Sequence, residues 1–161
     1  MASLDQAQLD SLAQRPEQIL PLSPLQAGLL FHSQLSDSNS TYVNQLVLPL
    51  TGVDPARMRQ AWQALLVRHG VLRTSLLPAT LSDTRHQAVW SVQQVALPWL
   101  EKDLREVGES ALDDWCQHRL DKGFDLQAAP LWQVDLLRTS EQTWQCVLTL
   151  HHILMDGWST G

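Results

Sequence analysis

The residues best suited to chemistry lie in the segment LHHILMDGWS, residues 150–159. Two adjacent histidines end an apolar run, Asp156 follows His152 by four positions, and Gly157 comes next. A histidine titrates near neutral pH, so it can accept a proton from an attacking nucleophile. A following aspartate can brace the loop, and a glycine permits a sharp turn. The segment is therefore compatible with a catalytic histidine at the end of a strand.

The alternation of a β-strand separates the two histidines. If residues 144–152 form a strand, alternate side chains point to opposite faces of the sheet. One face then carries Trp144, Cys146, Leu148, Leu150 and His152, and the other carries Gln145, Val147, Thr149 and His151. The two rings point in opposite directions, so only one of them can occupy a given cavity.

Three other interpretations of the segment compete with this one. Metal-binding histidines lie at i, i+4 on a helix or i, i+2 on a strand, which adjacent histidines do not match, and no Cys or Glu cluster lies nearby. A Ser-His-Asp triad is disfavoured because no G-x-S-x-G segment is present and Ser159 suits a helix cap. From the residues alone, a hydrogen-bonded core histidine with Asp156 as a turn residue stays open.

The composition predicts one globular domain, or one lobe of a larger one. The 161 residues are 44% hydrophobic and 17% charged, which argues against disorder. A net charge of −6 without a basic run disfavours nucleic acid and anionic membranes as partners. No apolar stretch is long enough to cross a membrane, and the polar N-terminus does not resemble a signal peptide. Cys116 and Cys146 lie in apolar patterns, without a disulfide framework. We expect a cytoplasmic protein.

Local signals predict three helices. The first covers about 24–35, with Ser23, Pro24 and Gln26 at its start. The second begins after the cap Asp54 and ends near Gly70, and its predicted buried face is Met58, Trp62, Leu65 and Leu66. The third covers about 103–121, before Gly123, and its predicted inward residues are Val107, Ala111, Leu112, Trp115 and Cys116.

Strands are predicted at 41–50, just after Gly70, at 85–95, and in a hairpin formed by 130–138 and 143–152. Residues 1–18 suit a brief helix or a linker. Helices mixed with at least one hairpin predict an α/β fold around a mixed or mostly antiparallel sheet.

Three blocks in order resemble the condensation domains of non-ribosomal peptide synthetases. They are PLSPLQAGLLFHSQL (21–35), RHGVLRTSL (68–76) and LHHILMDGWSTG (150–161), which contains His-His-x-x-x-Asp-Gly. Gly70 stands where the family usually has an acidic residue. The seven-residue motif alone also occurs in other acyltransferases related to chloramphenicol acetyltransferase.

The resemblance implies a chloramphenicol acetyltransferase-like fold, in which two lobes enclose a tunnel. Residues 19–161 would form the N-terminal lobe, a two-layer α/β unit with helices packed on a mixed, mostly antiparallel sheet. The C-terminal lobe would be absent, so we expect the chain alone to be inactive. Residues 1–18 resemble the linker that follows an upstream carrier domain.

The resemblance also implies roles for the site residues. His152 would be catalytic, either as a base or as a positioning residue, and Gly157 would lie beside the reacting centre. His151 and Asp156 would support the site, and Arg73 would pair with Asp156. No metal and no directly bound cofactor is implied, because the substrates arrive on phosphopantetheine arms.

The implied reaction joins a donor acyl or peptidyl thioester to an acceptor aminoacyl thioester through an amide bond. The implied partners are an upstream donor carrier, a downstream acceptor carrier, an adjacent adenylation domain and the missing lobe. Two alternatives remain, an epimerisation domain of the same superfamily and a non-catalytic module that docks a carrier protein. The continuation MDGWS resembles condensation more than epimerisation.

Overall fold

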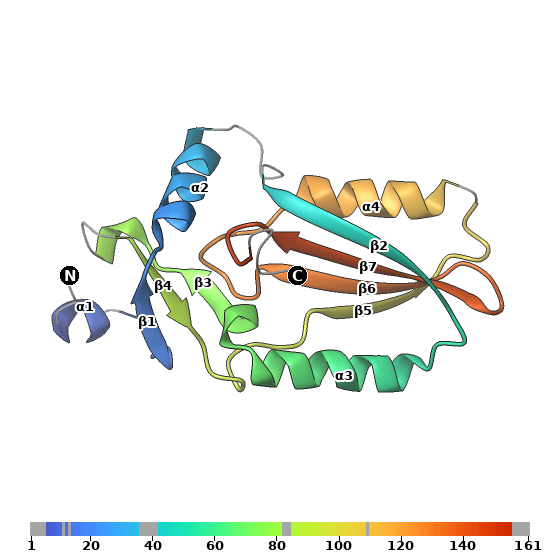
Figure 1. The fold of residues 1–161 in the computed structure, drawn as a ribbon, viewed down its shortest axis with the longest axis horizontal. Helices are drawn as coiled ribbons and strands as arrows, with labels where there is room; N and C mark the ends of the chain where they lie inside the picture. The colour runs from blue at the N-terminus through green and yellow to red at the C-terminus, as the bar shows by residue number, and fades with distance from the viewer. Residues whose placement is uncertain are drawn as a thin grey trace.

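The structure is a computed structural model of the 161-residue chain, and it describes residues 6–10, 12, 14–35, 42–81, 85–108 and 110–155. Its centre is a four-stranded sheet in the order β2-β7-β6-β5. The strands are β2 (Val43–Thr51), β5 (Trp99–Asp103), β6 (Trp132–Arg138) and β7 (Thr143–His151) (Figure 1). β7 is antiparallel to β2 and β6, whereas β5 is parallel to β6. The predicted mixed, mostly antiparallel sheet is confirmed.

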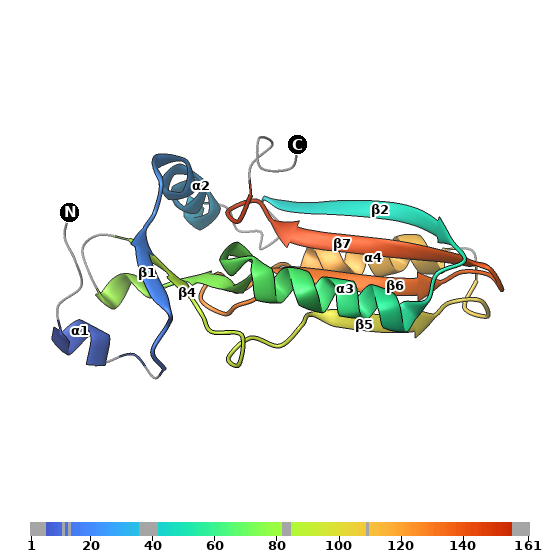
Figure 2. The same ribbon diagram turned by 60° about the horizontal axis from the view of Figure 1, so that its bottom comes forward.

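Helices α3 (Pro55–Arg68) and α4 (Ala111–Lys122) pack on opposite faces of this sheet (Figure 2). On the α3 face, Trp62 and Leu66 join Trp132 and Cys146 in the larger core. On the α4 face, the members of the smaller core are Leu104, Ala111, Leu112, Trp115, Cys116, Leu137 and Val147. Because both faces are covered, the central strands β6 and β7 are buried on both sides, and a helical layer lies on each side of the sheet.

A smaller sheet lies beside the first and includes the first strand of the chain (Figure 1). It has the order β1-β4-β3, with β1 (Gln18–Pro21), β3 (Thr74–Leu76) and β4 (His86–Val89) all antiparallel to their neighbours. The remaining elements are α1 (Gln6–Asp10), α2 (Pro24–Leu35) and two short 3₁₀ turns, η1 (Gly70–Arg73) and η2 (Ala79–Leu81). Packing against this sheet begins before residue 19, because the Glu17 N–H donates to the Val89 carbonyl at 2.8 Å.

The predicted caps of two helices are confirmed. The Ser23 N–H donates to Gln26 Oε1 at 3.0 Å, and the Gln26 N–H donates to Ser23 Oγ at 3.2 Å, so a reciprocal capping box starts α2. The Asp54 carboxylate accepts from the Arg57 N–H at 3.1 Å and caps α3, with Pro55 at its first position. The hairpin of β6 and β7 is also where the sequence predicted it.

Several predicted boundaries were wrong. Residues 103–108 and 110 are not helical, because β5 ends at Asp103 and α4 starts only at Ala111. Val107 consequently lies in a turn and is 61% exposed rather than inward. Leu65 is 39% exposed, since it points away from the stripe that Trp62 and Leu66 bury.

Two of the predicted strands, the one after Gly70 and the one over 85–95, are shorter in the structure than predicted. The segment after Gly70 first makes a 3₁₀ turn, and β3 begins only at Thr74. The strand predicted over 85–95 ends at Val89, because residues 92–94 form a turn in which the Gln94 N–H donates to the Ser91 carbonyl at 3.0 Å.

Candidate active site

The two adjacent histidines stand at the end of β7 and have different surroundings. His151 is the last residue of the strand, pairs with Val43 of β2, and is 3% exposed. Its N–H donates to the Leu131 carbonyl at 2.9 Å, and its Nδ1 accepts from the Ile153 N–H at 3.2 Å. This ring is therefore held within its own turn, which suits a supporting role.

The His152 ring is half-exposed and is held by the start of β2. The backbone N–H of His152 donates to the Tyr42 carbonyl at 2.7 Å, which continues the β2–β7 ladder by one bond. The next contact belongs to the ring. Its Nδ1 lies 3.2 Å from Asn44 Nδ2. The second ring nitrogen, Nε2, is the one through which this imidazole can contact a substrate.

The register of the sheet explains why Asn44 meets His152. Asn44 of β2 pairs with Leu150 of β7, and residues directly opposite in a sheet share a face. His152 follows Leu150 by two positions, so alternation returns it to that face. The predicted separation of the two rings agrees with this geometry, because His152 bonds across to β2 while His151 bonds within its own turn.

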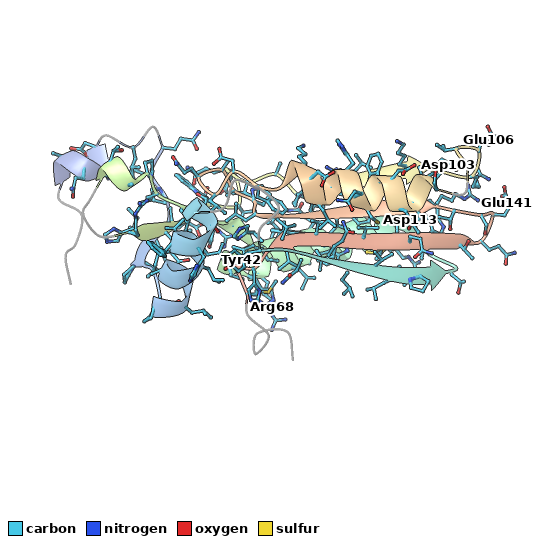
Figure 3. The ribbon with its side chains drawn as sticks, turned by 90° about the horizontal axis from the view of Figure 1, so that it is seen from above. Tyr42, Arg68, Asp103, Glu106, Asp113 and Glu141 are labelled. Atoms are coloured by element: carbon cyan, nitrogen blue, oxygen red, sulfur yellow. The ribbon has the colours of Figure 1, made fainter. Side chains whose placement is uncertain are left out.

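Tyr42 has an unusual backbone conformation beside His152. Its φ is +67°, in the left-handed region that residues other than glycine rarely adopt. The carbonyl of this residue is the one that accepts from the His152 N–H. Figure 3 shows Tyr42 at the start of β2, at the opposite end of the sheet from Asp103, Glu106 and Glu141. Strained residues persist where the surrounding structure holds them, and they often lie at functional sites.

Arg73 is buried at the end of the η1 turn. Its Nη1 donates to Glu17 Oε2 at 2.8 Å and to the Trp90 carbonyl, and its Nε donates to the Leu66 carbonyl at 3.1 Å. These bonds tie α3, η1 and the segment before β1 together. The guanidinium thus has three described partners besides the predicted partner Asp156.

Gly70 begins the turn that carries Arg73. A β-carbon at this position would lie 3.1 Å from Val89 Cγ1, which is tighter than ordinary van der Waals contact. A larger residue here requires the Val89 side chain to shift.

Asp156, Gly157 and Ser159 lie outside the described residues. The pairing of Asp156 with Arg73, the position of Gly157 beside the reacting centre and the capping role of Ser159 therefore stay predictions. The part of the chain that the structure describes contains no group of three or more His, Cys, Asp or Glu side chains that could hold a metal ion.

Sequence reasoning missed Tyr42 and Asn44. They lie 110 and 108 positions before His152, and only the antiparallel register of β2 and β7 brings them to the histidine. A signal was available in the sequence, since the polar Asn44 interrupts the predicted apolar strand at 41–50.

Comparison with solved structures defines the fold of the chain. The starter condensation domain of the rhizomide synthetase RzmA matches with a TM-score of 0.75 and 21% identity, over 88% of this chain and 34% of that one. A four-domain nonribosomal peptide synthetase, holo-AB3403 bound to AMP and glycine, matches with a TM-score of 0.75 and 21% identity, over 94% of this chain and 12% of that one. The fold is that of a condensation domain.

Comparison of sequences gives the family. Residues 16–161 match the family described as Condensation domain, so the chain belongs to the condensation domain family. It is 35% and 37% identical to two subunits of the linear gramicidin synthase of Brevibacillus parabrevis, in each case over 99% of this chain. One of the plipastatin synthase subunits of Bacillus subtilis (strain 168) is 34% identical over 88% of it. The chain spans only 2–4% of the length of these relatives.

Among the described residues, no helix is both long enough and apolar enough to cross a membrane.

Proposed function

We propose that residues 19–161 are the N-terminal lobe of a condensation domain that forms an amide bond between two carrier-bound thioesters. The observation that supports this proposal most directly is the partial exposure of His152 together with its contacts. His152 is partly exposed just after β7, its ring contacts the Asn44 side chain of β2, and its backbone N–H donates to the carbonyl of Tyr42, the residue before β2. A histidine with only a packing role would be buried, as His151 is.

The proposed reaction transfers an acyl group from sulfur to nitrogen. The amine of the acceptor aminoacyl thioester attacks the carbonyl carbon of the donor acyl or peptidyl thioester. The new C–N bond forms, the C–S bond breaks, and a proton from the amine ends on the departing sulfur. His152 contacts the reacting centre through Nε2, where an imidazole can orient the amine or exchange its proton.

Supporting roles fall to four other residues of the motifs. His151 anchors the turn after β7 through its bonds to Leu131 and Ile153. We infer that Asp156 pairs with Arg73, which is buried at the end of η1. Gly157 would let the backbone approach the substrate closely, because it lacks a side chain.

The partners follow from the same proposal. An upstream carrier would present the donor, and a downstream carrier would present the acceptor. Each substrate would be attached to its carrier through a phosphopantetheine arm. The C-terminal lobe would supply the second wall of the tunnel, so we expect the chain alone to be inactive. An adjacent adenylation domain would load the acceptor carrier. The similarity to long peptide synthases and to a four-domain synthetase supports partners of this kind.

The test measures amide formation by the complete domain in its natural polypeptide, with both carriers loaded. His152→Ala should lower the rate at least about 100-fold, the lower range for a lost acid–base group. His118→Ala is the matched control, because His118 is exposed on α4. Normal amide formation by the His152 variant would overturn the assignment.

The same assay separates the alternatives. An epimerisation domain would exchange the α-proton of a carrier-bound residue with solvent deuterium and form no amide. A docking module would bind carriers and do neither. The continuation MDGWS favours condensation over epimerisation, and the match to the Condensation domain family supports the assignment to amide formation.

A further inference from the structure

The contact between Asn44 and His152 determines which form of the imidazole meets the substrate. Asn44 Nδ2 lies 3.2 Å from His152 Nδ1. An amide NH₂ group can only donate a hydrogen bond, so Nδ1 must be the acceptor. In a neutral imidazole only one nitrogen carries the proton, so a ring that accepts from Asn44 at Nδ1 carries its proton on Nε2.

Two bonds, one from β2 and one from the residue before it, hold His152. The Tyr42 carbonyl holds its backbone N–H at 2.7 Å, and Asn44 holds its ring. Both bonds come from residues at the start of one strand, whose pairing with β7 runs from Val43 to Thr51. The β2–β7 register therefore sets the ring orientation as well as the backbone, and the histidine needs little reorganisation when substrate binds.

We propose that Asn44 is a positioning residue, which keeps neutral His152 in the Nε2–H form so that the ring acts on the substrate as a hydrogen-bond donor. This inference rests on the proposed function and makes its mechanism more specific. A bare Nε2 could take a proton from the amine, whereas Nε2–H cannot. The proton-bearing nitrogen can instead donate to the thioester carbonyl oxygen, which gains negative charge as the amine attacks.

The proton balance of the step is unchanged. The amine loses one proton and the departing thiolate gains one, so the imidazole ends the reaction as neutral as it began. His152 stabilises the tetrahedral intermediate while this transfer occurs.

Nitrogen NMR of the polypeptide labelled with ¹⁵N at its histidines tests the tautomer without any assay of activity. The His152 signals are assigned by their loss in His152→Ala. We expect the Nε2–H form in the unmodified chain and a mixture of tautomers in Asn44→Ala. Asn44→Asp should give the Nδ1–H form, because a carboxylate can only accept a hydrogen bond.

Gln45→Ala is the matched control for strand β2. Gln45 is the next residue and bonds on the other face, to the Cys116 carbonyl at 3.2 Å and to Thr149 Oγ1 at 3.0 Å. Its loss should alter stability while leaving the His152 tautomer as it was. A tautomer change common to both positions would point to general damage of the strand and would overturn the specific role of Asn44.

Kinetics in the natural polypeptide test the catalytic consequence. Asn44→Ala should lower kcat about tenfold with little change in KM, the rate equivalent of about one hydrogen bond. Asn44→Asp should lower kcat further, because it presents a bare Nε2 to the oxyanion.

The outcomes separate this inference from the proposed function. Full activity of His152→Ala would reject the proposed function, while the NMR experiment would still report on Asn44. An Nδ1–H form in the unmodified chain would overturn the positioning role. So would a His152 tautomer that stays the same in both Asn44→Ala and Asn44→Asp. Unchanged kcat in both variants despite a changed tautomer would overturn its catalytic part.

Discussion

Arg119 of α4 holds the buried carboxylate of Asp135, in the middle of β6, with two parallel hydrogen bonds. Nε donates to Oδ2 at 2.6 Å and Nη2 donates to Oδ1 at 2.7 Å. Asp135 is 0% exposed and also accepts from Trp115 Nε1 at 3.0 Å and Gln133 Nε2 at 3.1 Å. Three of these four bonds, two from Arg119 and one from Trp115, join α4 to the centre of the sheet.

Replacing Asp135 with alanine should strongly destabilise the fold. Arg119, itself largely buried, would keep its charge without the partner, which costs about 3–5 kcal/mol in the free energy of unfolding. Urea denaturation measures the loss. Asp10→Asn is the control, because Asp10 pairs with Arg15 at an exposed position and should cost less than about 1 kcal/mol. Equal effects of the two changes would contradict a stabilising role for the buried pair.

Arg73→Gln should also destabilise the fold. The change removes the donors to the Leu66 and Trp90 carbonyls and the ion pair with Glu17, and we expect a loss of about 2–3 kcal/mol. Glu17→Gln should cost under about 1 kcal/mol, because Glu17 is half-exposed. Comparable melting temperatures for Arg73→Gln and the unmodified chain would refute the structural role of Arg73.

Melting of Arg73 variants alone cannot report on Asp156, since Arg73 has three other partners. A double-mutant cycle of Arg73→Gln with Asp156→Asn isolates their coupling. We expect a coupling energy above about 0.5 kcal/mol if the predicted pair forms, and strictly additive effects would reject it.

Features that depend on neighbouring residues were predictable from the sequence. The caps at Ser23 and Asp54 and the β6–β7 hairpin each depend on contacts within a few positions along the chain. Strand β5 was not predictable in this way. Its residues carry helix-compatible side chains at Glu101 and Lys102, and only parallel pairing with β6 makes the segment extended. Tertiary pairing outweighs local propensity here.

The candidate site also combines features that local sequence predicts with features that depend on contacts between distant strands. Alternation along one strand predicts that His152 and His151 face apart, because the period is local. The contact of His152 with Asn44 needs the register between two strands more than 90 residues apart, which no local pattern encodes. The buried Asp135 is a similar case, since its partner Arg119 comes from another element.

Asp103 should titrate below the ordinary range. Hydrogen bonds from the Arg105 side chain, then from its backbone, lower the pKa of this carboxyl from 3.8 to about 2. A lowered pKa stabilises the folded state above the unfolded value, so this contribution should be lost as the pH falls from about 4 to about 2. Carboxyl-carbon NMR of Asp103 checks the value. In Arg105→Gln the carboxyl should titrate near 3.8, and a pKa near 2 in that variant would remove Arg105 as the cause.

Cys146 and Cys116 should react slowly with thiol reagents in the folded chain. Burial raises the pKa of the Cys146 thiol, and the charge of Asp135 adds to this effect. Burial also raises the pKa of Cys116, followed by the charges of Asp113 and Asp135. Since only the thiolate reacts, a raised pKa and a closed core both slow the reaction.

A disulfide reagent at about pH 7.5 tests this expectation, because the thiolate fraction limits the reaction there. Cys146 is 1% exposed in the α3-side core, so we expect it to react only when urea unfolds the chain. Cys116, partly buried on the sheet-facing side of α4, should react faster than Cys146 but slower than in the unfolded chain. Cys116→Ser isolates the buried thiol for this comparison. Rapid labelling of Cys146 in that folded variant would mean that the core between α3 and the sheet opens readily.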